Sequence, residues 1–278
     1  ERRKRRRCVR DGYAWILPLV ACFWWWAMLI GLLVSWIVSG RQPYYTDYAN
    51  MSRWIIYLSD VAATNRQPVF ICGSALMGVF GVWATYEEYR LRSEKACYLL
   101  PYFNRITKCL QFCLVIAMSL SSFFILMVSC FKVTTHTQIH VLFLALFIAF
   151  DVVFAIIDLI LKLIYNYHYR EPYFAISFAI TLIWTLCTVA AISFYGIFIL
   201  VANDQGNASY FYGYSGVMEW TACFLYGLVF FILAVDLTRP KVGMKFRKHR
   251  INTSSSAGTT LTGVSDGLQF PEMAQTML

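Results

Sequence analysis

Charged residues are scarce in this chain, and their scarcity argues against a soluble globular protein. Asp, Glu, Lys and Arg make up 14% of the 278 residues, whereas 59% are hydrophobic. Soluble domains carry about 25% charged residues. The sequence also lacks a nucleophile elbow, a phosphate-binding loop, a dinucleotide fingerprint and a zinc-protease motif. We therefore predict no catalytic residue, no cofactor and no enzymatic activity.

The nine cysteines follow no disulfide or metal-binding pattern. Cys109 and Cys113 have the i, i+4 spacing of one helical face, but no His or second cysteine pair accompanies them. We interpret them as packing residues and predict no metal site. Cys8 lies in a basic run that suits S-palmitoylation, and an ordinary free thiol explains it equally well.

Six long apolar runs dominate the chain. Each has about the 20 residues that ~30 Å of hydrocarbon requires. The runs cover residues 13–38, 68–86, 108–131, 139–165, 173–201 and 217–236. They predict an all-α membrane protein built as a six-transmembrane-helix bundle. The connection between the third and fourth runs is so short that these two spans should form an antiparallel hairpin.

The basic residues predict the orientation of this bundle. If the N-terminus is cytosolic, all of the 24 Lys and Arg except Arg41, Arg53, Arg66 and Lys132 fall in cytosolic segments. Positive charge in short loops stays on the cytosolic side. We therefore expect both termini in the cytosol. The domains follow as a basic N-terminus (1–12), a membrane domain (13–236) and a basic, then disordered, cytosolic tail (237–278).

Two aspartates fall at membrane depth in the fourth run. Asp151 lies near its middle, and Asp158 follows on the same helical face. Ionisable groups in hydrocarbon are costly and mark functional candidates. For Asp151 we give equal weight to a functional role and to a structural role in which the neutral side chain joins helices. For Asp158, which can pair with Lys162 one turn later, we favour the structural role.

Two histidines and one glutamate stand at predicted outer boundaries. His136 and His140 flank the start of the fourth run with zinc-compatible spacing, but no carboxylate or thiol is adjacent in sequence. Helix capping or headgroup contact suits them better. Glu219 precedes Trp220 at the start of the sixth run, where water can reach it.

The net charge of +9 indicates membrane lipid, and not nucleic acid, as the partner. Basic residues next to a span are attracted to anionic headgroups by about 1 kcal/mol each. The predicted anionic-lipid contacts are Arg5, Arg6, Arg7, Arg239, Lys241, Lys245, Arg247, Lys248 and Arg250. Simple enforcement of orientation would account for about half of this charge.

Several motifs resemble a known membrane-protein family. A first span with tryptophans at 24–26 leads to Leu-Ser-Asp-Val-Ala-Ala-Thr-Asn-Arg-Gln-Pro at 58–68 and Phe-Ile-Cys-Gly-Ser at 70–74. The motif residues are Ser59, Asp60, Pro68, Gly73, His136, His140 and Glu219. This pattern resembles the family of the damage-regulated autophagy modulators (DRAM), the FGF-receptor-activating proteins and the yeast Sfk proteins, also called the CWH N-terminal domain family. The triple tryptophan and basic ends are most similar to fungal Sfk-type members.

The resemblance implies a six-span protein without established catalysis. Sfk-type members help to keep a phosphatidylinositol 4-kinase complex at the plasma membrane and influence lipid asymmetry. DRAM-type members modulate autophagy in lysosomal membranes. The polybasic ends favour the plasma membrane over the lysosome or vacuole, so we expect a scaffold for phosphoinositide synthesis. The rival hypotheses are a transporter of lipid or protons past Asp151 and an enzyme that remodels glycosylphosphatidylinositol anchors.

Glycosylation tests the topology. Asn50 and Asn207 begin sequons in predicted outside loops, whereas Asn252 begins one in the predicted cytosolic tail. Asn207 should carry a glycan, because Asn50 is expected close to the bilayer, and Asn252 should carry none. Glycosidase digestion of single Asn→Gln variants measures this. A glycan on Asn252 would contradict the six-span topology.

Overall fold

The computed structural model describes residues 13–40, 55–93, 99, 104–170, 172–204 and 208–238. Over these residues the regular structure is helical. The helices are α2 (Ile16–Val38), α3 (Leu58–Ala62), α4 (Gln67–Ser93), α5 (Arg105–Cys130), α6 (Thr137–Tyr169), α7 (Pro172–Asp204) and α8 (Ala208–Leu237). Six of these helices, all but α3, are long and apolar enough to cross a membrane. The predicted six-helix fold is confirmed.

The last two long helices extend beyond their predicted spans. α7 has 33 residues, or about 50 Å of helix, which exceeds the ~30 Å of hydrocarbon. α8 begins at Ala208 because aromatic rings in its first turns pack on the end of α7. For example, the ring centroids of Phe198 and Tyr214 are 5.5 Å apart. The predicted loop 202–216 is thus mostly helical. Asn207 lies outside the described residues, as do Asn50 and Asn252.

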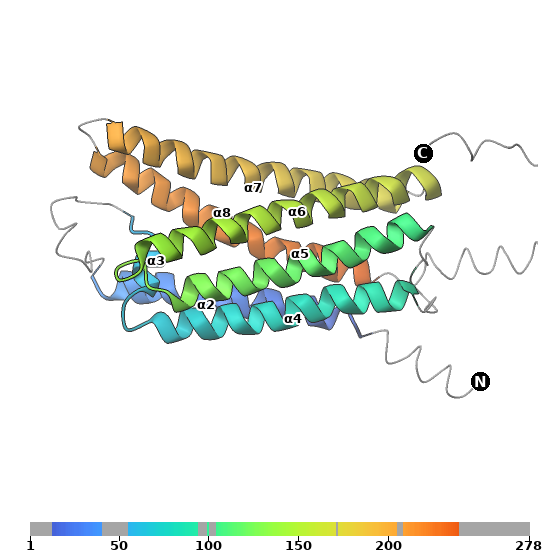
Figure 1. Ribbon diagram of the computed structural model, residues 1–278, viewed down its shortest axis with the longest axis horizontal. Helices are drawn as coiled ribbons and strands as arrows, with labels where there is room; N and C mark the ends of the chain where they lie inside the picture. The colour runs from blue at the N-terminus through green and yellow to red at the C-terminus, as the bar shows by residue number, and fades with distance from the viewer. Residues whose placement is uncertain are drawn as a thin grey trace, which may run out of the picture.

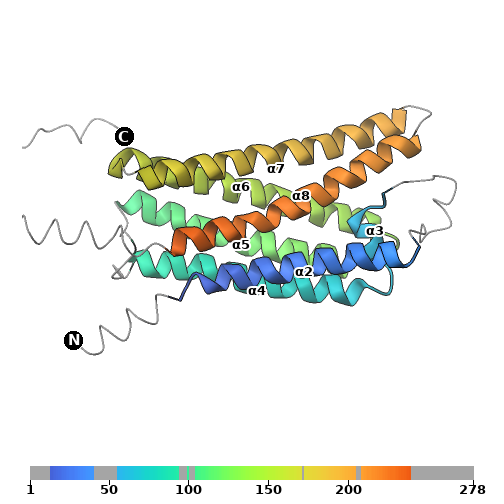
Figure 2. The ribbon, with the colours of Figure 1, turned by 180° about the vertical axis from the view of Figure 1, so that it is seen from behind.

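The long helices form two layers. α4, α5 and α6 lie side by side in chain order, with α7 beyond α6 (Figure 1). α2 and α8 cross behind them (Figure 2), where α2 packs against α4 and α8, and α8 packs against α7. The start of α2 and the end of α8 lie at one end of the bundle with Arg90 and Arg105, which we call the basic end. The opposite end, which carries α3, is the α3 end.

Short connections join neighbouring helices. α5 and α6 pack closely as the predicted antiparallel hairpin, and the His136 N–H donates to the Lys132 carbonyl in their turn, at 3.0 Å. α6 ends at Tyr169, and the left-handed backbone of Arg170 (φ 49°) closes the helix before Pro172 starts α7. Proline suits the first turn of a helix, where its missing N–H costs nothing.

Tryptophan side chains fix α8 between its neighbours. The indole N–H groups of Trp25 and Trp26 on α2 donate to the carbonyls of Cys223 and Phe224, at 2.7 and 3.3 Å. From α7, Trp184 donates to the next carbonyl of α8, that of Leu225, at 2.7 Å. Such bonds matter because lipid provides no alternative partner for a buried N–H. α8 is therefore held from two sides at the same level.

Gly227 of α8 allows Trp25 and Trp26 of α2 to approach this helix closely. A Cβ added at Gly227 would lie 2.1 Å from the Trp26 Nε1 atom and 2.9 Å from Trp25 Cδ1. Gly227→Ala should therefore destabilise the bundle, by about 1–3 kcal/mol as for other overpacked sites. Small residues at helix crossings support this kind of close approach in membranes.

The matched control for this prediction is Gly196→Ala in α7, where an added Cβ would meet nothing within 4 Å. Thermal unfolding of both variants in detergent measures the difference. A melting temperature lowered equally in both variants would show that the α2–α8 approach is unimportant.

Candidate functional site

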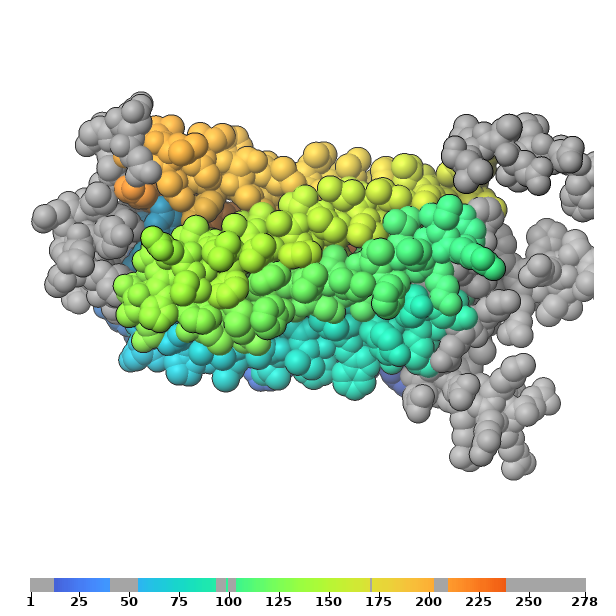
Figure 3. Space-filling view, viewed as in Figure 1, coloured from blue at the N-terminus to red at the C-terminus, as the bar shows by residue number. Residues whose placement is uncertain are grey.

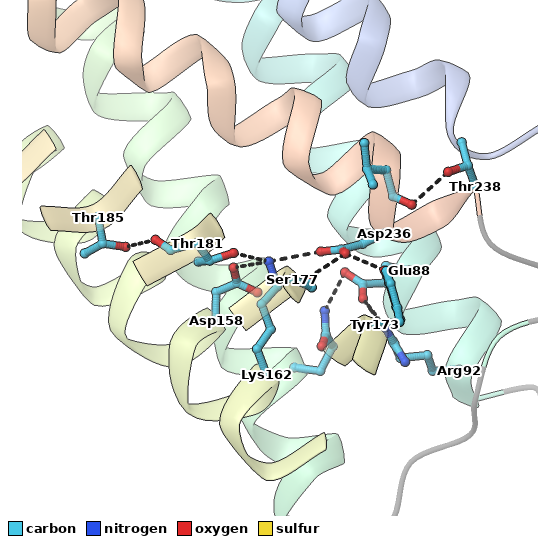
Figure 4. Close-up of polar contacts among 12 residues, drawn as sticks. Glu88, Arg92, Asp158, Lys162, Tyr173, Ser177, Thr181, Thr185, Asp236 and Thr238 are labelled. Carbon is cyan, nitrogen blue, oxygen red and sulfur yellow. Dashed lines mark hydrogen bonds and ion pairs between the residues drawn. The ribbon is translucent and has the colours of Figure 1, made fainter. Parts of the chain in front are cut away.

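A buried network of charges joins α6, α7 and α8 near the basic end. Lys162 lies between two carboxylates, with its Nζ 2.9 Å from Asp158 and 3.0 Å from Asp236 (Figure 4). It also donates to the Thr181 hydroxyl at 2.6 Å. The hydroxyls of Tyr173 and Ser177 donate to Asp236 at 2.6 and 2.8 Å. These residues form the Lys162 network, which confirms the predicted Asp158–Lys162 pair and adds a carboxylate from α8.

A second polar cluster lies beside this network on α4 and α5. Glu88 pairs with Arg92 one turn later at 2.7 Å and accepts a hydrogen bond from Gln111 at 3.1 Å. Arg92 lies over the ring of Tyr165 on α6, 5.0 Å from its centroid. Glu88, Arg92 and Gln111 are all buried. The basic end is therefore crosslinked by polar contacts from α4 through to α8.

At the opposite end, α3 docks on α8. The Leu58 N–H donates to the Glu219 carboxylate at 3.0 Å, and the Trp220 indole donates to the Ile56 carbonyl at 3.0 Å. Ser59 also hydrogen-bonds to Glu219. Gly216 lets the backbones approach, since an added Cβ would lie 3.2 Å from the Ile55 carbonyl oxygen. Glu219 thus binds α3 and is not simply hydrated.

The remaining motif residues join helices at the same end. His140 is buried, and its Nδ1 lies 2.7 Å from the Phe131 carbonyl, so it caps the end of α5 as expected. His136 precedes α6 without a side-chain cap.

The other motif residues lie in α3 and α4. Pro68 lies in the first turn of α4, and Gly73 faces Met28 of α2, whose Cβ would be 2.6 Å from a Cβ added at Gly73. Asp60 is buried in α3.

Asp151 stands apart from these contacts. It lines a cavity of about 60 Å³ between α2, α6, α7 and α8, together with Thr188, Tyr195 and Glu219. It is 6% exposed, and its Oδ1 atom has no hydrogen-bond partner within the described ranges of the chain. No hydrogen bond of this oxygen joins two helices in the part of the chain that the structure describes. Both the functional role and the neutral, helix-joining role of Asp151 stay predictions.

The predicted anionic-lipid contacts lie outside the described residues. This applies to Arg5, Arg6 and Arg7 and to the run from Arg239 to Arg250. The structure describes only the helix ends from which these segments emerge.

Comparison with known proteins identifies the family. Residues 13–239 match the model of the Frag1/DRAM/Sfk1/Cwh43P N-terminal domain. The chain belongs to this family. It is also similar to Protein SFK1 of Saccharomyces cerevisiae, at 30% identity over 82 residues, which is 30% of this chain and 23% of the yeast protein. The aligned segment thus spans about a quarter of that relative. No solved structure matches the chain. It is a multi-pass membrane protein of the Frag1/Sfk family.

Sequence reasoning missed the partners that come from distant helices. In the sequence, Asp236 is only the last residue of the sixth apolar run, and Glu88 and Arg92 only follow the end of the second run at residue 86. The i, i+4 spacing of Glu88 and Arg92 was the available signal. No local pattern could have paired Asp236 with Lys162, because the two lie on different helices.

The Lys162 network should behave as one unit. Lys162→Met leaves Asp158 and Asp236 without their cation, and breaking a buried ion pair in this way costs about 3–5 kcal/mol. Replacing the set together, as Asp158→Asn, Lys162→Met and Asp236→Asn, should restore most of that loss because no unpaired charge remains. Denaturant titration in detergent measures both.

Lys108→Met is the control, since this exposed lysine lies on α5. It should leave the stability nearly unchanged. A triple variant as unstable as Lys162→Met would show that shape, and not charge balance, makes the network important.

Proposed function

We propose that the protein is a non-enzymatic scaffold that holds phosphoinositide-synthesising machinery at the plasma membrane and influences lipid asymmetry. The partner we expect is a phosphatidylinositol 4-kinase complex. The observation that carries this proposal is the packing of the basic end. There, a separate hydrophobic cluster of Leu91, Leu99 and Leu237 packs against Ala14 and Trp15.

This cluster brings the two basic segments of the chain together. Ala14 lies four residues after Arg10, the last residue of the N-terminal basic run, and Leu237 lies two residues before Arg239, the first residue of the C-terminal one. Both runs therefore emerge from the same patch of the basic end. Tethering raises the local concentration of each run at the membrane surface, so that weak headgroup contacts add up.

Additional basic residues lie at the same end of the bundle. Arg90 and Arg92 end α4, and Arg105 starts α5. Arg90 and Arg92 are paired with Glu87 and Glu88, at 2.6 and 2.7 Å, which leaves the terminal runs as the larger source of net positive charge. Pro240 and Gly243 within the C-terminal run disfavour a regular helix. An adaptable charged strand suits a lipid surface better than a shaped pocket does.

Neutralising the C-terminal run tests the proposal. Exchange of Arg239, Lys241, Lys245, Arg247, Lys248 and Arg250 for Gln should leave membrane insertion intact, because the N-terminal basic run still orients the chain. It should reduce the amount of kinase complex at the plasma membrane, since about 1 kcal/mol of attraction is lost per charge. Imaging of tagged kinase with a phosphatidylinositol 4-phosphate reporter measures this.

The matched control exchanges every Arg of the run for Lys and every Lys for Arg, which keeps the charge. It should retain the kinase as the unchanged chain does. A peptide covering residues 239–250 should bind vesicles containing phosphatidylinositol 4-phosphate and not neutral vesicles, and the binding should weaken with salt. Equal binding to both vesicles at physiological salt would refute lipid sensing by this run.

A further inference from the structure

The Asp151 cavity lies where α6 and α7 separate. Both helices leave the tight turn at Arg170 together, but α7 then follows α8 and moves away from α6 toward the α3 end (Figure 1). The space-filling view shows a hollow between them in the half nearer α3, with α8 at its floor (Figure 3). Asp151 of α6, Thr188 of α7 and Glu219 of α8 line the cavity at this place.

Two polar groups of the cavity wall have no partner among the residues that the structure describes. The Oδ1 atom of Asp151 and the hydroxyl of Thr188 are buried without a hydrogen bond, and each residue is only 6% exposed. Leaving such a group unsatisfied costs about 1–3 kcal/mol. Because both line one cavity, a single small occupant with hydrogen-bonding capacity would satisfy both.

The charges around the cavity restrict that occupant. Among the described residues that line it, none is Lys, Arg or His, whereas two are acids, Asp151 and Glu219. The other titratable residues that face it are Tyr195 of α7 and Cys223 and Tyr226 of α8, and α2 contributes only Trp25. Two carboxylates in an apolar enclosure without a cation repel each other and lose their hydration, so protonation is the least costly way to neutralise the site.

We infer that the cavity is a hydrated proton-binding site. Asp151 takes up a proton from water at the α3 end, and water molecules past Thr188 connect it to Glu219. In this step the Asp151 carboxylate gains one proton and becomes a carboxylic acid, while hydronium is converted to water. The acid can then donate a hydrogen bond to the enclosed water.

The size of the cavity fits water. One buried water needs about 10–15 Å³ of such volume and two to four polar partners. The observed 60 Å³ therefore holds several waters, and Asp151, Thr188 and Glu219 supply the partners.

The cavity does not extend as far as the Lys162 network near the basic end. None of the described lining residues belongs to the Lys162 network, and the buried side chains of Phe154 and Leu161 follow Asp151 on α6. A proton that enters from the α3 end thus stops at Asp151. This arrangement suits a sensor of protons on the α3 side rather than a transport pathway.

Infrared spectroscopy of the full chain in lipid vesicles tests this inference. The unchanged protein should show the C=O stretching band of a protonated carboxylic acid, and the band should shift to lower frequency in D₂O. Labelling the aspartate carboxyl carbons with ¹³C should also shift it, which assigns the band without any substitution. Asp151→Asn should abolish the band that shifts with aspartate labelling, and Thr188→Val should slow the response to D₂O by interrupting the water chain.

The matched control is Asp158→Asn, which removes an aspartate seven residues away on the same helix that is paired with Lys162 and should leave the band unchanged. Three results would overturn the inference. These are a band insensitive to aspartate labelling, a band that does not respond to D₂O, and a band that disappears when sodium replaces choline in the buffer. The last result would indicate a cation site.

Discussion

The structure depends on one constraint, which is that a polar group within hydrocarbon must find its partner inside the protein. Lys162 meets this constraint with carboxylates from α6 and α8 and a hydroxyl from α7. The indoles of Trp25 and Trp184 meet it at carbonyls of α8. Because lipid tails are as apolar as leucine, hydrophobic burial does little to hold membrane helices together. These polar contacts, with glycine-mediated close packing, therefore determine the arrangement of the bundle.

The position of the polar contacts also explains where the bundle separates. α6 and α7 are tied at the basic end by the turn at Arg170 and the bond from Lys162 to Thr181. Toward the α3 end, Trp184 binds α7 to α8, and rings such as Phe198 and Tyr214 continue that contact. α6 instead stays with α5, its hairpin partner. The Asp151 cavity is the space left between two helices that follow different neighbours.

Hydropathy predicted the number of spans because it depends on composition along the chain, and the i, i+4 rule found the Asp158–Lys162 pair for the same local reason. Both methods failed where the structure of a residue depends on a partner from another helix. The aromatic and polar residues 208–216 were read as a loop, but the end of α7 supports them as helix. Glu219 was expected in water because its partner, the N–H of Leu58, is distant in sequence.

α8 connects the two ends of the protein physically. Its first half binds α3 through Glu219, and its last turns place Asp236 in the Lys162 network. Its end, Leu237, packs in the cluster from which the basic segments emerge. A change in the charge of Glu219 would act on its bond to α3 and on the Asp151 cavity together, since this one carboxylate takes part in both. The proposed proton site and the proposed lipid-binding end thus both include residues of α8.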